Sequence, residues 1–483
     1  MVAGSGTGVS GERSVHDARD GIAPILRALR EACVTLLAAI LTLACALAIA
    51  PGPGSGVLAV VLCLSLSRSQ LDRDRRGRIE AAIVLPVVGL AAVGVGALLH
   101  RAPWCGAFVF VAGMFVSIWL RRFGPMARRA GSLIALPFVV LLVTPHVGAV
   151  PGGFLPAWLT PIVIALLSLA WVGVLHALAR RTHFLLPARR PRAPIATPGS
   201  DSPLRPVAST RMAIQMAVAL AASFAVGYLV FAERWSWIVL TAFIVASGNR
   251  GRLDVAYKSV LRVLGAAAGT LVALSLSIRI GSHDATTVAL ILGAVFLGVW
   301  LRPLGYAWWA LFVTLALALL QGFSGAPAPA ILWPRLEEIV IGACIGVASA
   351  WFVLPVRSTA VLRRRIADAL AALSDALDPA ATQRSPDGFI ASIAAVEQLA
   401  PAFRAGRLVT KRMRVVQPAD WVDELIACRG PALALIDRHE TPVAARRAIG
   451  TARKAMREPR EILAALKALE SSLATCAASD RTG

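Results

Sequence analysis

The chain has 483 residues, of which 57% are hydrophobic and only 16% are charged. Soluble globular proteins carry about 45–50% apolar and about 25% charged residues, so this composition and the mean hydropathy of +0.71 exclude an ordinary soluble protein. The formal net charge of +22 invites nucleic-acid binding. The arginines, however, cluster in short segments between long apolar runs, where the positive-inside rule accounts for them. We therefore expect a multi-pass membrane protein with membrane lipid, and no nucleic acid, as its partner.

The apolar runs predict an all-α polytopic protein with about 12 transmembrane helices. The polar, Gly- and Ser-rich start predicts a disordered cytoplasmic N-terminus over 1–26. An Ala-Ile-Ala sequence ending at Ala50 imitates a signal-peptidase site, but Pro51 follows it directly, so we expect the first span to be retained. A first membrane half is expected over 27–181, with spans at Cys33–Ala50, Val57–Leu66, Ile79–Leu99, Cys105–Leu120, Ser132–Val147 and Ala157–Leu178.

A Pro- and Arg-rich segment over 182–209 predicts an extended cytoplasmic linker. A second membrane half is expected over 210–357, with spans at Met212–Phe231, Trp235–Ser247, Val260–Ile280, Thr286–Leu301, Tyr306–Gln321 and Leu336–Leu354. The second span of each half is short for a bilayer. These spans either break to line a substrate cavity, or tilt in a locally thinned bilayer.

The arginines occupy alternate loops, which places both termini and the linker on the cytoplasmic side. A six-residue motif supports an internal repeat: Trp119–Gly124 (WLRRFG) returns as Trp300–Gly305 (WLRPLG), an offset of 181 residues (300 − 119). Because six spans per half is an even number, the two halves would share one orientation. The sequence therefore predicts two parallel six-helix repeats with a substrate path between them.

Leu, Ile and Ala at helical spacing predict a C-terminal cytoplasmic helical domain over 358–483. The expected helices cover 359–378, 388–404, 419–437, 441–456 and 459–476. Lys411, Arg412 and Arg414 either lie against anionic lipid or form a solvated basic face. The chain shows no hydrolase elbow, Walker A loop, H-E-x-x-H or C-x-x-C motif, and its seven histidines are scattered. We therefore predict no enzyme, no cofactor and no metal site.

One apolar segment carries a charge that needs an explanation. Arg262, Gly265 and Gly269 recur every three or four residues and so share one helix face. Glycines at this spacing let a neighbouring helix approach closely. Arg262 either snorkels to the headgroups or pairs bidentately with a carboxylate. Thr241 shares a face with Trp237, and it either donates a hydrogen bond beside the ring or bonds back to its own helix.

Glu337 and Glu338 follow Arg335 at the start of the last expected span. They have three interpretations: one of them binds a proton, one pairs with Arg335, or both are solvated at the membrane interface. The last interpretation is the simplest for charges at a helix end.

This arrangement resembles the fusaric acid resistance/aromatic acid exporter superfamily, the FUSC-type or integral membrane bound transporter domain. The resemblance covers about residues 211–356, as Trp and Thr in one span, a basic loop, then Arg and spaced glycines. The positions that carry it are Trp237, Thr241, Arg262, Gly265, Gly269, Tyr306, Thr314, Arg335, Gly342, Gly346 and Pro355. The chain has Ala266 where the family often has threonine, so that detail is unsupported.

The resemblance implies a secondary transporter of the bacterial inner membrane that exports small organic, in particular aromatic, carboxylic acids. A substrate site is implied at Trp237, Thr241, Arg262, Tyr306 and Thr314. The resemblance also implies close helix packing at Gly265, Gly269, Gly342 and Gly346, and a periplasmic adaptor protein as a partner. The substrate, the coupling ion and whether the chain forms a homo-oligomer stay open.

Three alternatives remain. Asp74–Arg78 (DRRGR) resembles the D-R-x-G-R signature of the major facilitator superfamily, which also has two six-helix halves. Plant malate channels are distantly similar, which would make the protein a passive anion channel. A scaffold that does not transport and recruits partners through its C-terminal helices is the third alternative.

Overall fold

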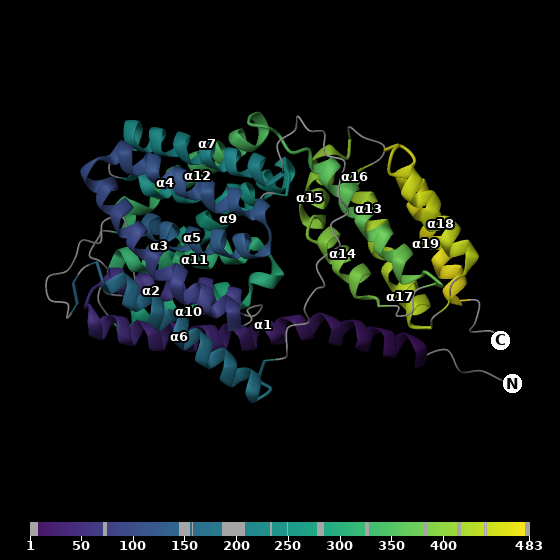
Figure 1. Ribbon diagram of the computed structural model, residues 1–483, viewed down its shortest axis with the longest axis horizontal. Helices are drawn as coiled ribbons and strands as arrows, with labels where there is room; N and C mark the ends of the chain where they lie inside the picture. The colour runs from purple at the N-terminus through teal and green to yellow at the C-terminus, as the bar shows by residue number, and fades with distance from the viewer. Residues whose placement is uncertain are drawn as a thin grey trace. The chain divides into compact units, whose positions relative to one another are not determined.

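The computed structural model describes residues 8–70, 75–143, 155–156, 158–185, 208–231, 234–248, 250–277, 285–323, 328–380, 385–412, 417–438, 440 and 442–478. Every regular element among these residues is a helix (Figure 1). The chain forms two compact units. The first is Met1–Ala188, Pro206–Ser247 and Lys258–Ser349, and the second is Arg189–Arg205, Gly248–Tyr257 and Ala350–Gly483.

The first helical half of the first unit consists of six α-helices and one 3-10 turn. Their bounds are α1 (Gly8–Ile49), α2 (Pro53–Gln70), α3 (Arg75–Arg101), α4 (Pro103–Trp119), η1 (Leu120–Phe123), α5 (Pro125–Val143) and α6 (Thr160–Arg181). Proline at the first turns of α4 and α6 suits a helix start, where its missing N–H leaves no bond unmade. α1 begins at Gly8, so it covers part of the stretch 1–26 for which the sequence predicts disorder.

The second helical half also has six α-helices among the described residues, with an added π-helical turn after the first of them. It consists of α7 (Ala208–Val226), the π-helical η2 (Gly227–Phe231), α8 (Trp235–Ala246), α9 (Arg252–Ser277), α10 (Ala285–Trp300), η4 (Arg302–Leu304), α11 (Tyr306–Phe323) and α12 (Ala328–Phe352). The basic turn expected before the glycine helix is shorter than predicted, since Arg252 and Lys258 already lie in α9. Most of the predicted linker, together with Asp74 and Arg414, lies outside the described residues.

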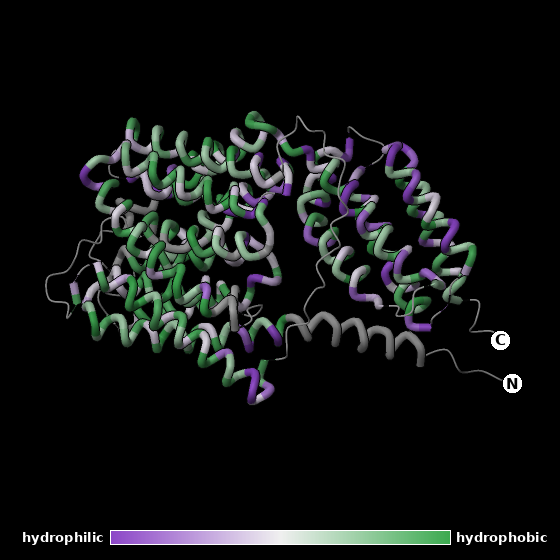
Figure 2. The backbone as a smooth tube through the Cα atoms, in the orientation of Figure 1, coloured by the Kyte–Doolittle hydropathy of each residue, from purple (hydrophilic) through white to green (hydrophobic). Residues whose placement is uncertain are grey.

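The surface of the first unit shows that its solvent is lipid. Along α3, large aliphatic side chains recur on one exposed face, and small or apolar side chains fill the buried face. The exposed ones are Ile79, Ile83, Val87 and Leu90, and the buried ones are Ala81, Leu85, Val88 and Ala92. An exposed apolar stripe of this length is costly in water but normal against acyl chains. Figure 2 shows the same hydrophobic character along the other helices of this unit.

Six of the described helices are long and apolar enough to cross a membrane, namely Ile25–Ile49, Ile79–Arg101, Pro103–Phe123, Thr160–Arg181, Ser209–Phe231 and Arg252–Leu276. Four shorter apolar helices accompany them, namely Gly54–Ser67, Trp235–Ala246, Thr286–Trp300 and Tyr306–Leu320. The protein is therefore an all-α, multi-pass membrane protein.

The two halves share a local structure at the repeated motif. In each half the fourth helix ends at a tryptophan, a 3-10 turn follows, and the turn reaches a glycine with positive φ. These glycines are Gly124 (φ +106°) and Gly305 (φ +152°), and an added Cβ would meet no atom within 4 Å at either one. The backbone conformation, rather than a lack of space, therefore favours glycine at both positions.

The two halves also pack reciprocally. α4 of the first half lies against α7, the first helix of the second half (Figure 1). Conversely, α1, the first helix of the first half, lies against α10, the fourth helix of the second half.

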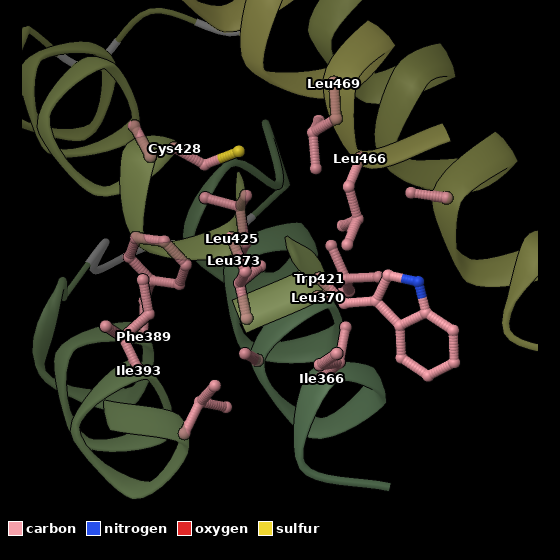
Figure 3. Close-up of a cluster of buried hydrophobic side chains, with 14 of the residues drawn as sticks. Ile366, Leu370, Leu373, Phe389, Ile393, Trp421, Leu425, Cys428, Leu466 and Leu469 are labelled. Atoms are coloured by element: carbon pink, nitrogen blue, oxygen red, sulfur yellow. The ribbon is translucent and has the colours of Figure 1, made fainter. Parts of the chain in front are cut away.

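The second unit has its own apolar core. Its helices are α13 (Ser358–Ala376), α14 (Asp387–Glu397), α15 (Ala400–Thr410), α16 (Pro418–Ala427), α17 (Arg429–Asp437), α18 (Val443–Ala455) and α19 (Ile462–Ala478). Side chains of α13, α14, α16 and α19 converge in this core (Figure 3). Burial, with smaller effects from Glu470 and Glu424, raises the pKa of Cys428 to about 12, so this thiol stays neutral and serves as an apolar side chain.

Two of the helices predicted for this unit are each split in two. The stretch 388–404 forms α14 and α15, and 419–437 forms α16 and α17. Pro401 and Pro431 lie four residues after the last residues of α14 and α16. A proline clashes with the carbonyl four residues before it and offers no N–H, which favours a helix end at that point.

The second unit also takes in Gly248–Tyr257, which the sequence places in the second membrane half. Hydrogen bonds donated by backbone N–H groups near the start of α9 hold this segment in the second unit. Arg252 N donates to Val356 O at 3.2 Å, and Leu253 N donates to Ser358 Oγ at 2.9 Å.

Candidate functional site

The site is built around α8, a short helix that follows a break. Its 12 residues span about 18 Å at 1.5 Å per residue, well below the roughly 30 Å of a hydrocarbon core. The π-helical turn η2 precedes it, and a Cβ on Gly227 would lie 2.6 Å from Trp235 Cβ. Nine of the 12 residues of α8 are buried, including Trp237 and Thr241. This helix therefore brings an aromatic ring and a hydroxyl group to the inside of the unit.

Glycines bring α9 and α11 into close contact. A Cβ on Gly265 would lie 2.7 Å from Ala310 Cβ, and a Cβ on Gly269 would lie 2.5 Å from Leu311 O and 3.1 Å from Thr314 Cβ. Since neither approach leaves room for a methyl group, the glycine face of α9 is pressed onto the backbone of α11. Arg262 lies on this same face.

A second pair of glycines brings α12 into contact with α8. A Cβ on Gly342 would lie 2.5 Å from Ile238 O and 2.9 Å from Thr241 Cβ, and one on Gly346 would lie 2.9 Å from Val245 Cγ1. The four glycines singled out from the sequence thus lie at two close helix crossings, α9 with α11 and α12 with α8.

Arg262 is buried, with 1% of its side chain exposed. Its Nη1 donates a hydrogen bond to Thr314 Oγ1 at 3.3 Å, and it interacts electrostatically with Tyr306, the first residue of α11. Its Nε and Nη2 atoms have no hydrogen-bond partner among the described residues. The snorkelling interpretation is therefore wrong for this arginine, because the close α9–α11 crossing leaves its side chain inside the protein.

Arg335 is a second buried arginine, also 1% exposed, which the sequence did not place in the substrate site. Its Cζ lies 3.9 Å from the centroid of the Trp237 ring, a close cation–π contact. It also interacts electrostatically with Arg262. Two guanidinium groups that repel each other away from water favour an anionic partner.

Thr241 is fully buried beside Gly342, and its Oγ1 atom finds no hydrogen-bond partner among the described residues. The alternative bond back to its own helix is therefore not made. The structure places the predicted residues in three groups. Arg262 interacts with Thr314 and Tyr306, Trp237 contacts Arg335, and Thr241 lies at the α8–α12 crossing.

The interface interpretation of the acidic pair holds for one residue and fails for the other. Glu337 is exposed. Glu338 is 1% exposed, and its Oε1 lies 3.6 Å from Nε of Arg234, whose side chain is 52% exposed. The packing of α12 against α8 buries Glu338, which a helix-end position in the sequence does not disclose.

Comparison with known proteins points to the same part of the chain. Residues 216–349 match the family model described as fusaric acid resistance protein-like. No curated protein and no solved structure matches the chain. The matched stretch runs from α7 into α12 and contains every predicted site residue. Over this stretch the chain is similar to the fusaric acid resistance protein-like family.

Proposed function

We propose that the protein is a secondary transporter that exports small organic acid anions, aromatic carboxylates in particular, across the bacterial inner membrane. The observation that carries this proposal is the buried, incompletely bonded Arg262 beside a second buried arginine. A buried guanidinium with unfilled donors is costly, and a bound anion removes that cost.

The free donors of Arg262 have a geometry that suits a carboxylate. Nε–H and the neighbouring Nη2–H form one side of the guanidinium fork, which binds both oxygens of a carboxylate at once. The third nitrogen, Nη1, is already held by Thr314, so the orientation of the fork is fixed. The hydroxyl group of Thr241, which has no hydrogen-bond partner among the described residues, would offer the substrate a polar contact. The ring of Trp237 would offer it an aromatic surface.

The architecture that we propose has 12 spans in two parallel six-helix repeats, with the substrate path between them. Two observations support it: the repeated Trp–3-10–Gly turn, and the reciprocal contacts of α4 with α7 and of α1 with α10. A two-fold axis that relates the halves would generate such paired contacts. In this proposal the termini, the linker 182–209 and the helical domain 358–483 are cytoplasmic, and a periplasmic adaptor takes up the exported anion.

The test is transport in vesicles reconstituted with the purified protein, with a panel of labelled aromatic acids and with or without a proton gradient. We expect saturable carboxylate flux that Arg262→Gln abolishes. The matched control is Arg101→Gln, which removes an exposed arginine from the same unit and should leave the flux unchanged. No flux for any acid, or equal flux in the two variants, would contradict the proposal. Ohmic currents far above carrier turnover would show a passive anion channel instead.

A further inference from the structure

The buried carboxylate of Glu338 lies between two arginines that differ in their surroundings. Arg335 is three residues earlier on α12, which puts both side chains on one face of that helix, and the two interact electrostatically. On its other side Glu338 faces Arg234, the residue that precedes α8. The Oε1 atom of Glu338 accepts no hydrogen bond from any described residue. This oxygen is thus held by the charge of Arg234 rather than by a hydrogen bond.

The charges around Glu338 come from three elements. Arg234 precedes α8, Arg335 and the exposed Glu337 are on α12, and Arg262 of α9 acts on this group through Arg335. Arg234 is half exposed and meets solvent, whereas Arg335 and Arg262 are buried. The carboxylate of Glu338 is therefore a buried negative charge that acts on Arg335, which in turn interacts with Arg262.

We propose that Glu338 is an internal counter-ion of the Arg262–Arg335 pair, and that a substrate carboxylate binds in competition with it. This inference rests on the proposed function, and it adds the group that links anion binding to protons. When Glu338 takes up a proton, Arg335 loses its compensating negative charge, and the site holds a bound anion more strongly. Thermodynamic linkage makes the effect reciprocal, so anion binding favours proton uptake by Glu338. Arg234 opposes this competition because it draws the carboxylate away from Arg335.

The experiment is equilibrium binding of labelled benzoate to the full-length protein in lipid nanodiscs, between about pH 6 and pH 8. A carboxylic acid stays ionised over this range, so the probe itself does not titrate. For the wild type we expect affinity to rise as the pH falls, by a factor within the roughly 5–150-fold range of typical site coupling. Glu338→Gln should bind at every pH as tightly as the wild type does at low pH. Arg234→Gln should bind more weakly, and the double variant should behave like Glu338→Gln.

Glu337→Gln is the matched control, since it removes a carboxylate one residue away that is exposed. It should keep the rise in affinity toward low pH, with only a small shift of its midpoint, since Glu337 has the smallest effect among the charges that act on Glu338. If Glu338→Gln also kept that rise, or if Arg234→Gln bound more tightly than the wild type, the inference would be overturned while the proposed function stood. If benzoate bound to no form of the protein at any pH, the proposed function would fail and the inference with it. Should Glu338→Gln fail to fold, the double variant, which removes both partners of the ion pair, decides the question.

Discussion

The two helical halves of the first unit each have six α-helices among the described residues but bury different side chains. The first half buries a hydrogen-bonded cluster, in which Ser67 Oγ lies 2.6 Å from Thr35 Oγ1 and 3.1 Å from His176 Nε2. Cys63 Sγ donates to Thr42 Oγ1 in the same half. Among the described residues, the buried arginines and glutamates all lie in the second half, namely Arg262, Arg335 and Glu338.

This difference suggests that one half stabilises the structure and the other half binds the ligand. Hydroxyl and imidazole groups that bond to one another hold α1, α2 and α6 together and leave little need for a ligand. The Nε and Nη2 donors of Arg262 lack partners among the described residues, which costs stability, and an anion that binds them removes this cost. We infer that the first half supports the second, and that the chemistry of recognition belongs to the second.

The largest expected effect is on Arg262. Replacing it with Gln should reduce carboxylate affinity at least about 30-fold, because loss of one partner of a buried charged pair costs about 2–5 kcal/mol. Equilibrium binding and the thermal unfolding temperature should be measured together. If Arg262→Gln folded and bound carboxylates as tightly as the wild type, the second half would not be the site of recognition.

Gly269→Ala should destabilise the α9–α11 crossing by about 1–3 kcal/mol, since its new methyl group would press on the backbone at Leu311 O. Thermal unfolding in detergent provides the measurement. Gly293→Ala on α10 is the matched control, because a Cβ there meets nothing within 4 Å, and its unfolding temperature should not fall. An unchanged or higher unfolding temperature in Gly269→Ala would contradict the close crossing, because alanine otherwise favours a helix over glycine.

Trp237→Leu removes the ring that faces Arg335 while keeping an apolar side chain in α8. The loss of a desolvated cation–π contact, worth about 2 kcal/mol, should loosen Arg335 and weaken aromatic carboxylate binding about tenfold or more. Aliphatic carboxylates should lose less than aromatic ones. An equal loss for both classes of acid would show that the ring positions Arg335 without contacting the substrate.

Ser67→Ala should have the smallest effect on carboxylate affinity, and its main effect should be on stability. It removes the hydroxyl that joins Thr35 to His176, which should cost about 1–3 kcal/mol because buried polar groups lose a partner. Thermal stability should fall while carboxylate affinity stays within about twofold of the wild type. An affinity loss as large as that of Arg262→Gln would place recognition in both halves.

Residue size and periodicity were enough to predict the helix crossings. Gly265 and Gly269, like Gly342 and Gly346, repeat every four residues, which puts each pair on one face of a helix. The ends of α14 and α16 were not predicted, because periodicity runs through both breaks, although Pro401 and Pro431 disfavour a continuous helix there.

The burial of the charges could not be predicted in this way. Arg335 and Glu338 lie in a polar stretch just after Pro334, which locally has the composition of a helix end at the membrane surface. The packing of α12 on α8 buries both side chains and brings Arg335 over the ring of Trp237. These two helices are about 100 residues apart in the sequence, so local composition does not disclose the contact. The π-helical turn before α8 likewise depends on tertiary contacts rather than on local propensity.

The central claim, that the second half holds an anion on its buried arginines, is tested most directly by comparing two ligands of the same shape. Benzoate and benzamide differ in charge and in the ability to accept two hydrogen bonds from one guanidinium. The account predicts that the purified protein binds benzoate well above benzamide, and that Arg262→Gln removes this preference. Equal binding of the two ligands, or an unchanged preference in Arg262→Gln, would contradict it.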